Sequence, residues 1–560
     1  MRRKTTAGIL AMTLAAATLL WGCSGAKTEN ENRKDALSYD DAVAEMETLV
    51  KTVKKTEVKN PTMDIYSEEP SEADSLSPLD TFPIMVDGIG DVNVEIAAAT
   101  EMSADAPDDW LNVVAKNFNK EKFKIDGKQI SVSVRKITSG EVVTYVNAGL
   151  YKPDVFIPSN YAWGKMLDAS GVEIEKVEDR IAGNTAGLLI EKGTYEKFVE
   201  KYGEPTVANI LDASIAGDVT FAYTNPYTSS TGLNALTAML KAFDEDDPLS
   251  EKATAKLIEY QKQSPPVAYT TAVLRRSAAK GLINAMVMEE QAYVNVPELK
   301  GYEYVPFGIR HDHPVYVFEW TDEDERKVVE KFVEYCKSDE SQKLADERGF
   351  NRHEDYESQD SGMTGTDYLN AQKVWKKNKN GGRPIVAVFV TDTSGSMDGT
   401  PITTLRKSLV AATPYVGDEH YVGLVSYSGS TTINLPIERF DDKQRAYFSG
   451  EVKNLTASGG TATYDAVLVA LKMIVDKLEE VPDAKPMLFL LTDGDQNEGY
   501  SLDRIKGIVG GLQVPVYSIA YNYGVSEELE TLSSINEAAV IKADEDDVAN
   551  NLRNLFNVNM

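Results

Sequence analysis

The chain has 560 residues, of which 42% are hydrophobic and 26% charged, and its formal net charge is -30. A chain of this length exceeds a single hydrophobic core, so we expect two or three soluble globular domains. The acidic excess excludes non-specific binding to nucleic acid, because the phosphate backbone would be repelled.

A targeting segment is predicted for residues 1–23. Three basic residues at positions 2–4 precede an apolar stretch, Ala7 to Leu20, that is too short to span a membrane. The following Leu20-Trp21-Gly22-Cys23 resembles the lipobox of bacterial lipoproteins, in which the cysteine becomes the lipidated first residue of the mature chain. This resemblance implies an extracytoplasmic protein of the bacterial cell envelope, anchored to the membrane by lipid at Cys23. The alternative is an ordinary signal peptide with a chance cysteine.

Residues 24–91 are interpreted as a polar tether and an N-terminal extension. From Tyr39 to Val53 the apolar residues recur at helical spacing, so we expect a short amphipathic helix that packs on the body of the protein. Glu68 to Asp80, rich in Ser, Pro and acidic residues, is predicted to be a loop.

A first α/β domain is predicted for residues 92–352. A strand from Val92 to Ala99 is followed by a helix that Ser103, Asp105 and Pro107 are expected to open. Further strands are predicted around residues 130–134 and 152–160, with a helix beginning at Ser139 between them. Strands that alternate with helices predict a parallel sheet with right-handed crossovers.

Several motifs of this domain resemble those of bacterial extracellular solute-binding proteins, the two-lobed receptors of transport systems. They lie, in order, at residues 153–159, 183–185, 221–233, 285–289, 304–306 and 341–350. The resemblance covers about residues 92–352. It implies a two-lobed, periplasmic-binding-protein-like fold.

A cleft for a small solute follows from these motifs. Thr228, Ser229 and Ser230 bring hydroxyls to a predicted helix start, where free amides and the helix dipole favour an anion or a polar group. Candidate ligand-binding residues at other element ends are Ser103, Ser139, Ser159 and Glu289. We therefore expect a small polar or anionic solute. The alternative is that the hydroxyl residues only cap helices.

Other residues of this domain are given structural roles. His311 and His313 have the spacing of a metal pair, but no third ligand is in view, so we expect a surface loop. Cys336 is expected to be a small buried side chain on a helix. Residues 353–382 are interpreted as an interdomain linker with a short helix around Tyr368 to Trp375.

The last domain, residues 383–560, begins with the apolar run Ile385 to Val390. This run predicts a strand buried on both faces, followed by Asp392, Ser394 and Ser396. A glycine turn at residues 458–460 precedes Thr461, and a second buried strand ends at Asp493. In sheets of this kind, small molecules and ions bind at the carboxyl ends of the strands. The carboxylate and hydroxyl oxygens that are expected there suit a hard divalent cation.

These three stretches, in this order, resemble the von Willebrand factor A (VWA) domain and its metal-ion-dependent adhesion site. The resemblance implies a doubly wound, Rossmann-like α/β fold with a mainly parallel sheet. It also implies a cation, Mg2+ first and Mn2+ or Ca2+ as alternatives, and an open coordination position for an acidic group of a partner. The metal ligands would be Asp392, Ser394, Ser396, Thr461 and Asp493. Thr463 is an alternative to Thr461, and strand-end helix caps are the simpler explanation of both aspartates.

We expect a binding protein rather than an enzyme. The sequence has no hydrolase triad order, no cysteine–histidine pair, no phosphate loop and no dinucleotide fingerprint. An aspartyl phosphatase would require a second acid at position 394, which is a serine. The preferred interpretation is a lipid-anchored surface protein that recognises a protein or matrix partner through the cation. The alternatives are a solute receptor of a transport system with an accessory VWA domain and, third, a metal-dependent hydrolase.

Overall fold

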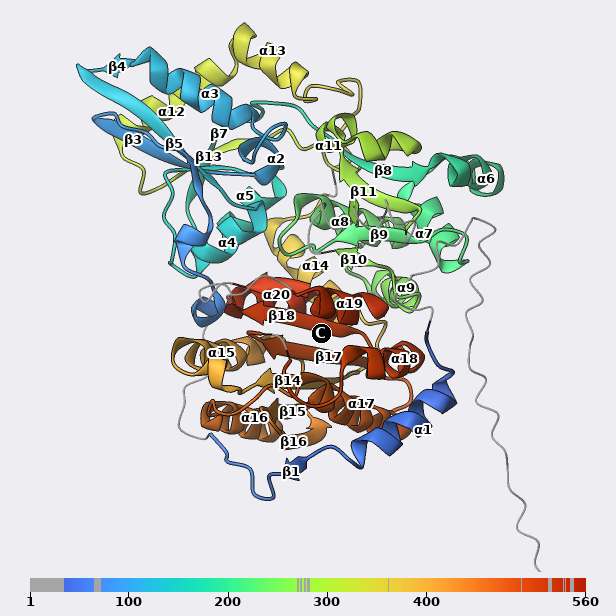
Figure 1. The fold of residues 1–560 in the computed structure, drawn as a ribbon. Helices are drawn as coiled ribbons and strands as arrows, with labels where there is room; N and C mark the ends of the chain where they lie inside the picture. Colours follow the sequence, from blue (N-terminus) through green and yellow to red (C-terminus); the bar gives the residue numbers. More distant parts are fainter. Residues whose placement is uncertain are drawn as a thin grey trace, which may run out of the picture.

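The computed structural model describes residues 35–64, 72–268, 271, 274–275, 278, 283–360, 362–494, 496–521, 526–536, 538, 540–543 and 548–560. The targeting segment with Cys23 and the tether at residues 24–34 lie outside the described residues. Figure 1 shows two α/β bodies, with the C-terminal one at the bottom of the view. Within the described ranges, no helix has the length and apolarity needed to cross a membrane.

The C-terminal body is built on a seven-stranded sheet with the order β1-β16-β15-β14-β17-β18-β19. Its strands are β1 (Lys55–Glu57), β14 (Ile385–Asp392), β15 (Tyr421–Tyr427), β16 (Thr431–Arg439), β17 (Lys485–Thr492), β18 (Val516–Tyr521) and β19 (Val540–Ala543). All pairings are parallel except that of β15 with β16. Every residue of the central strand β14 is buried, which confirms the strand predicted from its apolar run.

Helices cover both faces of this sheet, as expected of a doubly wound fold. One face packs against α15 (Thr400–Ala412), α16 (Asp442–Asn454) and α20 (Val548–Asn559). The other packs against α17 (Thr463–Glu480), α18 (Leu502–Leu512), α19 (Glu527–Ile535) and the N-terminal α1 (Tyr39–Val50). The predicted α/β class with a mainly parallel sheet is confirmed for this body.

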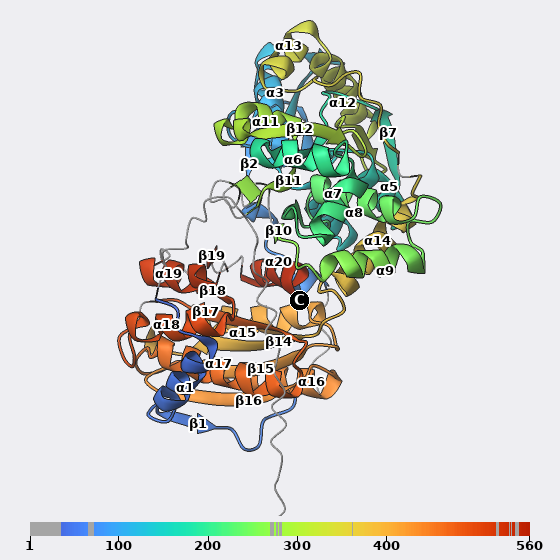
Figure 2. The same cartoon turned by 90° about the vertical axis from the view of Figure 1, so that its right-hand side faces the viewer.

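The N-terminal extension belongs to this C-terminal body in space. Strand β1 pairs with β16 and forms an edge of the sheet, and α1 packs on α17 and α18 through Ala42, Met46, Leu49 and Val50. Figure 2 shows both elements, in blue, against the lower body. The sheet is therefore assembled from two stretches of chain separated by more than 300 residues, because β1 ends at Glu57 and β14 starts at Ile385.

The upper body consists of two lobes. The first lobe has a sheet with the order β2-β5-β3-β6-β13-β7. Its strands are β2 (Ile84–Val86), β3 (Val92–Ala98), β4 (Lys124–Ile125), β5 (Lys128–Lys136), β6 (Val155–Ile157), β7 (Ile174–Glu178) and β13 (Val315–Phe318). Its helices are α2 (Thr100–Ser103), α3 (Trp110–Glu121), α4 (Ser139–Asn147), α5 (Ala162–Ala169), α12 (Glu323–Cys336) and α13 (Asp339–Glu347).

The second lobe has a five-stranded sheet with the order β10-β9-β11-β8-β12. Its strands are β8 (Ala186–Glu191), β9 (Phe221–Thr224), β10 (Val267–Ala268), β11 (Ala285–Glu289) and β12 (Tyr302–Phe307). Its helices are α6 (Lys192–Tyr202), α7 (Val207–Ile215), α8 (Ser230–Phe243), α9 (Glu251–Gln261) and α11 (Glu290–Asn295). The prediction of parallel sheets in these lobes was only partly right, because β12 and β11 run antiparallel to β8, and β13 runs antiparallel to β6.

The chain crosses between the lobes twice, at residues 179–185 and 308–314, so that β13 returns to the first lobe after β12. A further helix, α14 (Gly365–Asn378), packs on α5 of the first lobe and on α8 and α9 of the second. Tyr368 and Trp375 of α14 are fully buried in these contacts. The last turn of α14 then reaches the lower body, where Lys376 Nζ donates to the Phe556 carbonyl of α20 at 2.9 Å.

Candidate functional site

The residues predicted to bind a cation come together at the carboxyl edge of the lower sheet. Asp392 ends β14, and Asp493 follows the neighbouring parallel strand β17. Ser394 Oγ lies 3.0 Å from Ser396 Oγ, and Ser396 Oγ donates to Asp493 Oδ1 at 2.9 Å. Asp392, Ser394 and Asp493 are buried, whereas Ser396 is exposed. The cluster therefore opens to solvent on the Ser396 side.

Thr461 is brought to the same edge by the glycine turn. The Gly395 amide donates to the Gly459 carbonyl at 3.0 Å, and the Ser458 amide donates to the Thr393 carbonyl at 2.8 Å. The Thr461 amide donates to Asn497 Oδ1 at 2.9 Å. The glycine turn is thus held against the loop that carries Ser394, and Asn497, from the loop after β17, is held against the turn at Thr461.

Thr463, the alternative to Thr461, has a different partner. Its Oγ1 lies 3.3 Å from the Tyr427 hydroxyl, and that hydroxyl donates to Asp392 Oδ2 at 3.3 Å. Thr492 Oγ1 donates to the same Asp392 oxygen at 2.8 Å. Thr463 therefore reaches the cluster only through Tyr427, which orients Asp392 together with Thr492.

The two carboxyls of the cluster are placed where ionisation is costly. Burial raises the pKa of Asp392; hydrogen bonds from Ser394 and Thr492 oppose this rise, and the charge of Asp493 adds to it. Burial also raises the pKa of Asp493. A divalent cation between two such carboxyls would balance their charge and favour the ionised forms. The oxygen-only donor set fits a hard cation of this kind.

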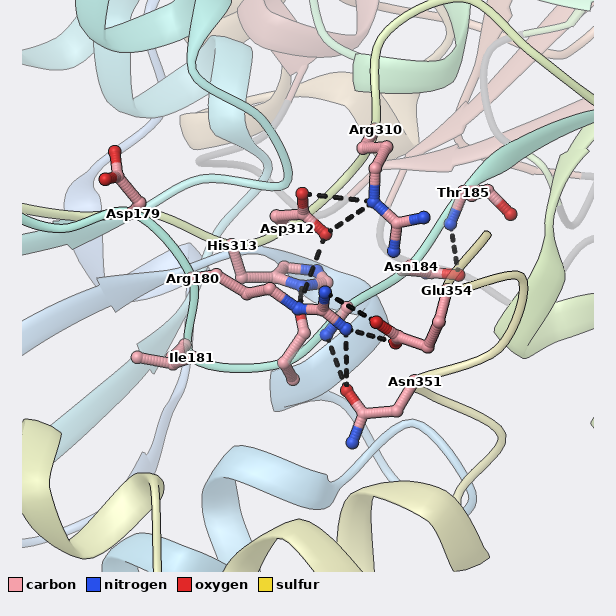
Figure 3. A network of polar contacts seen from close by, with 12 residues as sticks. Asp179, Arg180, Ile181, Asn184, Thr185, Arg310, Asp312, His313, Asn351 and Glu354 are labelled. Atoms are coloured by element: carbon pink, nitrogen blue, oxygen red, sulfur yellow. Dashed lines mark hydrogen bonds and ion pairs between the residues drawn. The ribbon is translucent and has the colours of Figure 1, made fainter. Parts of the chain in front are cut away.

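The two crossovers of the upper body are joined by a polar network (Figure 3). Arg180 of the first crossover lies 3.6 Å from Asp312 of the second and also pairs with Glu354. Arg310 Nε donates to Asp312 Oδ1 at 3.0 Å. Asn351 Oδ1 accepts from the Gly183 amide at 2.8 Å. The two crossovers between the lobes and the segment after α13 are therefore held together by this network.

Three of the predicted solute-binding serines lie together, although on different elements. Ser139 Oγ accepts from the Ser159 amide at 3.3 Å, and Ser230 Oγ lies 3.4 Å from Ser139 Oγ. Trp163 Nε1 also donates to Ser230 Oγ, at 2.8 Å. Ser139 and Ser159 belong to the first lobe and Ser230 to the second, so this buried group joins the lobes.

The other predicted solute-binding residues lie apart from that group. Ser103 is the last residue of α2 and donates to the Ala99 carbonyl at 2.8 Å, whereas α3 begins later, after Asp109. Ser229 caps α8 by accepting from the Gly232 amide, and the Thr228 carbonyl accepts from the Gly140 amide. Whether any of these residues touches a solute stays a prediction.

Glu289 faces a second group of polar residues that the sequence analysis did not connect. Its Oε1 accepts from Thr231 Oγ1 at 2.7 Å and lies 3.5 Å from His311 Nδ1. The expectation that His311 and His313 form a surface loop is wrong, because both side chains are 0% exposed. They lie on the second crossover, a loop between β12 and β13, but this loop is buried rather than on the surface.

Buried amides also lie near the strand ends of both lobes. The Nδ2 atoms of Asn160, Asn184 and Asn225 donate no hydrogen bond to any described residue. Asn160 follows β6, Asn225 follows β9, and Asn184 lies on the first crossover. Unpaired buried donors are uncommon and favour a polar ligand or ordered water at these positions.

Comparison with known proteins agrees with this geometry. Residues 99–351 match the family model of the bacterial extracellular solute-binding protein, and residues 387–557 match that of the von Willebrand factor type A domain. Inter-alpha-trypsin inhibitor heavy chain H3 of Mus musculus is 28% identical over 182 residues. The match covers 30% of this chain but only 20% of that relative, so the chain spans about a fifth of its length.

Solved structures resemble each part separately. A von Willebrand factor type A protein from Catenulispora acidiphila is 21% identical, covers 31% of this chain and 42% of its own, and has a TM-score of 0.29. Iron-bound HitA from Pseudomonas aeruginosa is 14% identical, covers 52% of this chain and 99% of its own, and has a TM-score of 0.37.

The two family matches define the class of the protein. The chain carries an extracellular solute-binding domain followed by a VWA domain, as the motifs of the sequence predicted. The solute-binding domain suggests an extracytoplasmic location.

Proposed function

We propose that the protein is a lipid-anchored, extracytoplasmic binding protein whose VWA domain holds a divalent cation and, through it, an acidic group of a protein or matrix partner. The observation that carries this proposal is the convergence of Asp392, Ser394, Ser396 and Asp493 at one edge, with Ser396 open to solvent. We propose a binding role for both domains, and no catalytic one.

The residues of this chain would share the work of holding the cation. The hydroxyls of Ser394, Ser396 and Thr461 are neutral ligands, and the carboxylates of Asp392 and Asp493 supply the charge, directly or through water. The cation, Mg2+ first and Mn2+ or Ca2+ as alternatives, supplies an open coordination position. A partner carboxylate there would make a short, directional and charge-balanced contact.

The position of the cluster leaves it free for a large partner. The opposite end of β14 faces the solute-binding domain, because Arg383, two residues before the strand, donates to Ser264 of the second lobe at 2.8 Å. At about 3.3 Å per residue, a strand of this length separates the two ends by roughly 25 Å. A partner at Ser396 would therefore not compete with the domain contact.

The solute-binding domain supports a second role for the same protein. Its two lobes, double crossover and unpaired buried amides favour a small polar solute held between the lobes. Delivery of that solute to a membrane permease, with the VWA domain as an accessory, is the alternative function. It predicts that uptake of a solute depends on this protein.

The main proposal is tested by capture of a partner. The bait is the chain from Ser24 onward, mixed with solubilised envelope proteins and secreted proteins in Mg2+ or in chelator. Asp493→Asn removes a carboxylate of the cluster, and Asp465→Asn of α17 is the matched control outside it. A protein retained only with Mg2+, by the wild type and the control but not by Asp493→Asn, supports the proposal. Retention of the same proteins in every condition would overturn it.

A further inference from the structure

Three potential metal ligands from three separate parts of the solute-binding domain meet where its lobes join. Glu101 lies on α2 of the first lobe, Glu289 ends β11 of the second lobe, and His311 lies on the crossover between them. One ligand atom from each of these side chains lies within 4.8 Å of the other two. This cluster is separate from the carboxyl edge of the VWA sheet, where Asp392, Ser394, Ser396, Thr461 and Asp493 lie and which is called the VWA edge below. The two groups share no residue.

His311 is the most informative member of the cluster. Its side chain is 0% exposed, and neither ring nitrogen makes a hydrogen bond with the described residues. Its Nδ1 lies 3.5 Å from Glu289 Oε1, which places the ring edge toward the carboxylates. A buried imidazole that makes no hydrogen bond through either nitrogen is costly unless something else binds it.

The segment of backbone that carries this ring is held in place by its neighbours. The His311 amide donates to the Asn184 carbonyl of the other crossover at 3.0 Å. The neighbouring Asp312 pairs with Arg310 and Arg180 in the network of Figure 3. A ligand atom on such a braced segment is preorganised, which favours binding of an ion over collapse of the site.

The two carboxylates are oriented by neighbours that are not themselves in the cluster. Glu101 Oε1 lies 3.1 Å from His313 Nε2, and the other nitrogen of that ring faces the Ala182 carbonyl at 2.9 Å. Glu289 accepts from Thr231 Oγ1. The Glu101 and Glu289 side chains are only 10% and 9% exposed. Supporting hydrogen bonds of this kind orient metal ligands in proteins.

The charge of the surroundings is also acidic. Asp108 accepts a hydrogen bond from Gln291, two residues after Glu289, and brings a third carboxyl near Glu101 and Glu289. Among the described residues, His313 and Arg275 are basic side chains near these three carboxyls. The region suits a cation better than an anion.

The donor set selects a class of cation. An imidazole nitrogen with two carboxylates suits first-row transition ions such as Zn2+, whereas Mg2+ and Ca2+ prefer oxygen ligands alone. Bonds of about 2.0–2.2 Å place ligand atoms roughly 3.3–3.6 Å apart around a tetrahedral ion. The three ligand atoms of the cluster lie within 4.8 Å of one another, so side-chain shifts of up to about 1 Å would close the cluster on the ion.

We propose that the solute-binding domain binds a divalent transition-metal cation of the Zn2+ class through Glu101, Glu289 and His311. The inference rests on the proposed role of this domain as a solute receptor and names its ligand. Because the three ligands come from both lobes and the crossover, the bound ion would hold the lobes together.

The test is a calorimetric titration of the full ectodomain with Zn2+ in excess Mg2+. All proteins carry Asp493→Asn, so that the VWA edge contributes no binding. Glu289→Gln and His311→Gln each remove one ligand, and Glu290→Gln changes the adjacent acid, which pairs with His353 instead. Circular dichroism without metal checks that each variant is folded.

We expect one Zn2+ site in the Asp493→Asn protein and in Glu290→Gln. We expect affinity to fall at least about 100-fold in Glu289→Gln and His311→Gln, since even supporting residues of metal sites cost 10–100-fold. Substitution with Co2+ should give visible absorption bands that His311→Gln alters. Absence of a Zn2+ site, or equal affinity in all four proteins, would overturn the inference. Uptake of a solute that requires this protein but no metal ion would also overturn the inference, although the role of the domain as a solute receptor would then be supported.

Discussion

At the scale of single residues, the two threonines near the glycine turn of the VWA edge have different contacts, and we expect different roles for them. Thr461 lies in the turn held to the serine loop, whereas the Thr463 hydroxyl contacts Tyr427. Thr461→Val should weaken Mg2+ binding by about tenfold, or about 1.4 kcal/mol, because a ligand oxygen is lost at nearly constant shape. Thr463→Val should leave it nearly unchanged. Calorimetric Mg2+ titration checks this, and an equal loss in both variants would contradict the assignment.

How far the sequence predicts site residues depends on how local their signal is. Asp392, Ser394 and Ser396 follow a recognisable strand, so their shared edge was predictable. Glu101 and His311 carry no such signal, because they meet only when the second crossover between the lobes packs beside the short helix α2 of the first lobe. His311 was misassigned to the surface because burial on a crossover depends on the lobes, not on neighbouring sequence.

At the scale of elements, the residue directly before β15 is a histidine, His420, whose protonation opposes folding. Burial lowers the pKa of His420 to about 3, and nearby Lys379 and Lys376 act in the same direction. An unfolded histidine takes up its proton near pH 6.5. The stability that neutral His420 contributes is therefore fully present above pH 6.5 and is lost as the pH falls toward 3.

The variant His420→Asn tests this dependence. Asparagine keeps an acceptor for the Ile385 amide, which donates to His420 Nδ1 at 3.4 Å, but it does not titrate. Between pH 6 and pH 5 the free energy of unfolding of the wild type should fall, relative to that of the variant, by about 1.2 kcal/mol. Denaturant unfolding at pH 7, 6 and 5 measures it. Parallel pH profiles for the two proteins would show that His420 is not responsible.

The docking of α20 on the solute-binding domain depends on a buried ion pair. Arg553 of α20 lies 2.8 Å from Glu141 of α4, with both side chains under 5% exposed. Arg553→Met leaves a buried charge unpaired and should cost about 3–5 kcal/mol. Glu141→Leu with Arg553→Met should recover most of this loss. Differential scanning calorimetry checks the pair, and equal losses in the single and double variants would argue against it.

Elements differ in how much sequence signal they carry. Strand β14, with its apolar run from Ile385 to Val390, and the long amphipathic α17 were predictable, since the run, the helical period and the lengths identify them. Strand β1 was not, because its three residues, Lys-Thr-Glu, are all exposed and show no alternation. Only its pairing with β16 makes it a strand.

At the scale of the whole molecule, the VWA unit is not contiguous in sequence. Helix α1 buries Leu49 in the core of that unit, more than 300 residues from β14. Leu49→Ala should lower the stability of the VWA unit by about 2–5 kcal/mol. Thr48→Ala, on the exposed face of the same helix, should change it little. Urea unfolding followed by circular dichroism measures both, and similar values would contradict the packing role of α1.

The general organisation was predictable from the sequence, because each domain carries its own ordered motifs. The position of the N-terminal extension was not, since an amphipathic helix shows which face it buries but not against which domain. The same holds for α14, which was expected to be part of a linker. Its buried Tyr368 and Trp375 instead tie both lobes together.

The central claim is that the VWA edge holds a divalent cation with one position open. The most direct measurement is anomalous diffraction at the manganese edge from crystals of the ectodomain grown with Mn2+. We predict a peak within about 2.5 Å of Ser394 Oγ and Ser396 Oγ, with water or a neighbouring carboxylate on its solvent side. No peak at this edge, in crystals where the serines and aspartates are well ordered, would contradict the account.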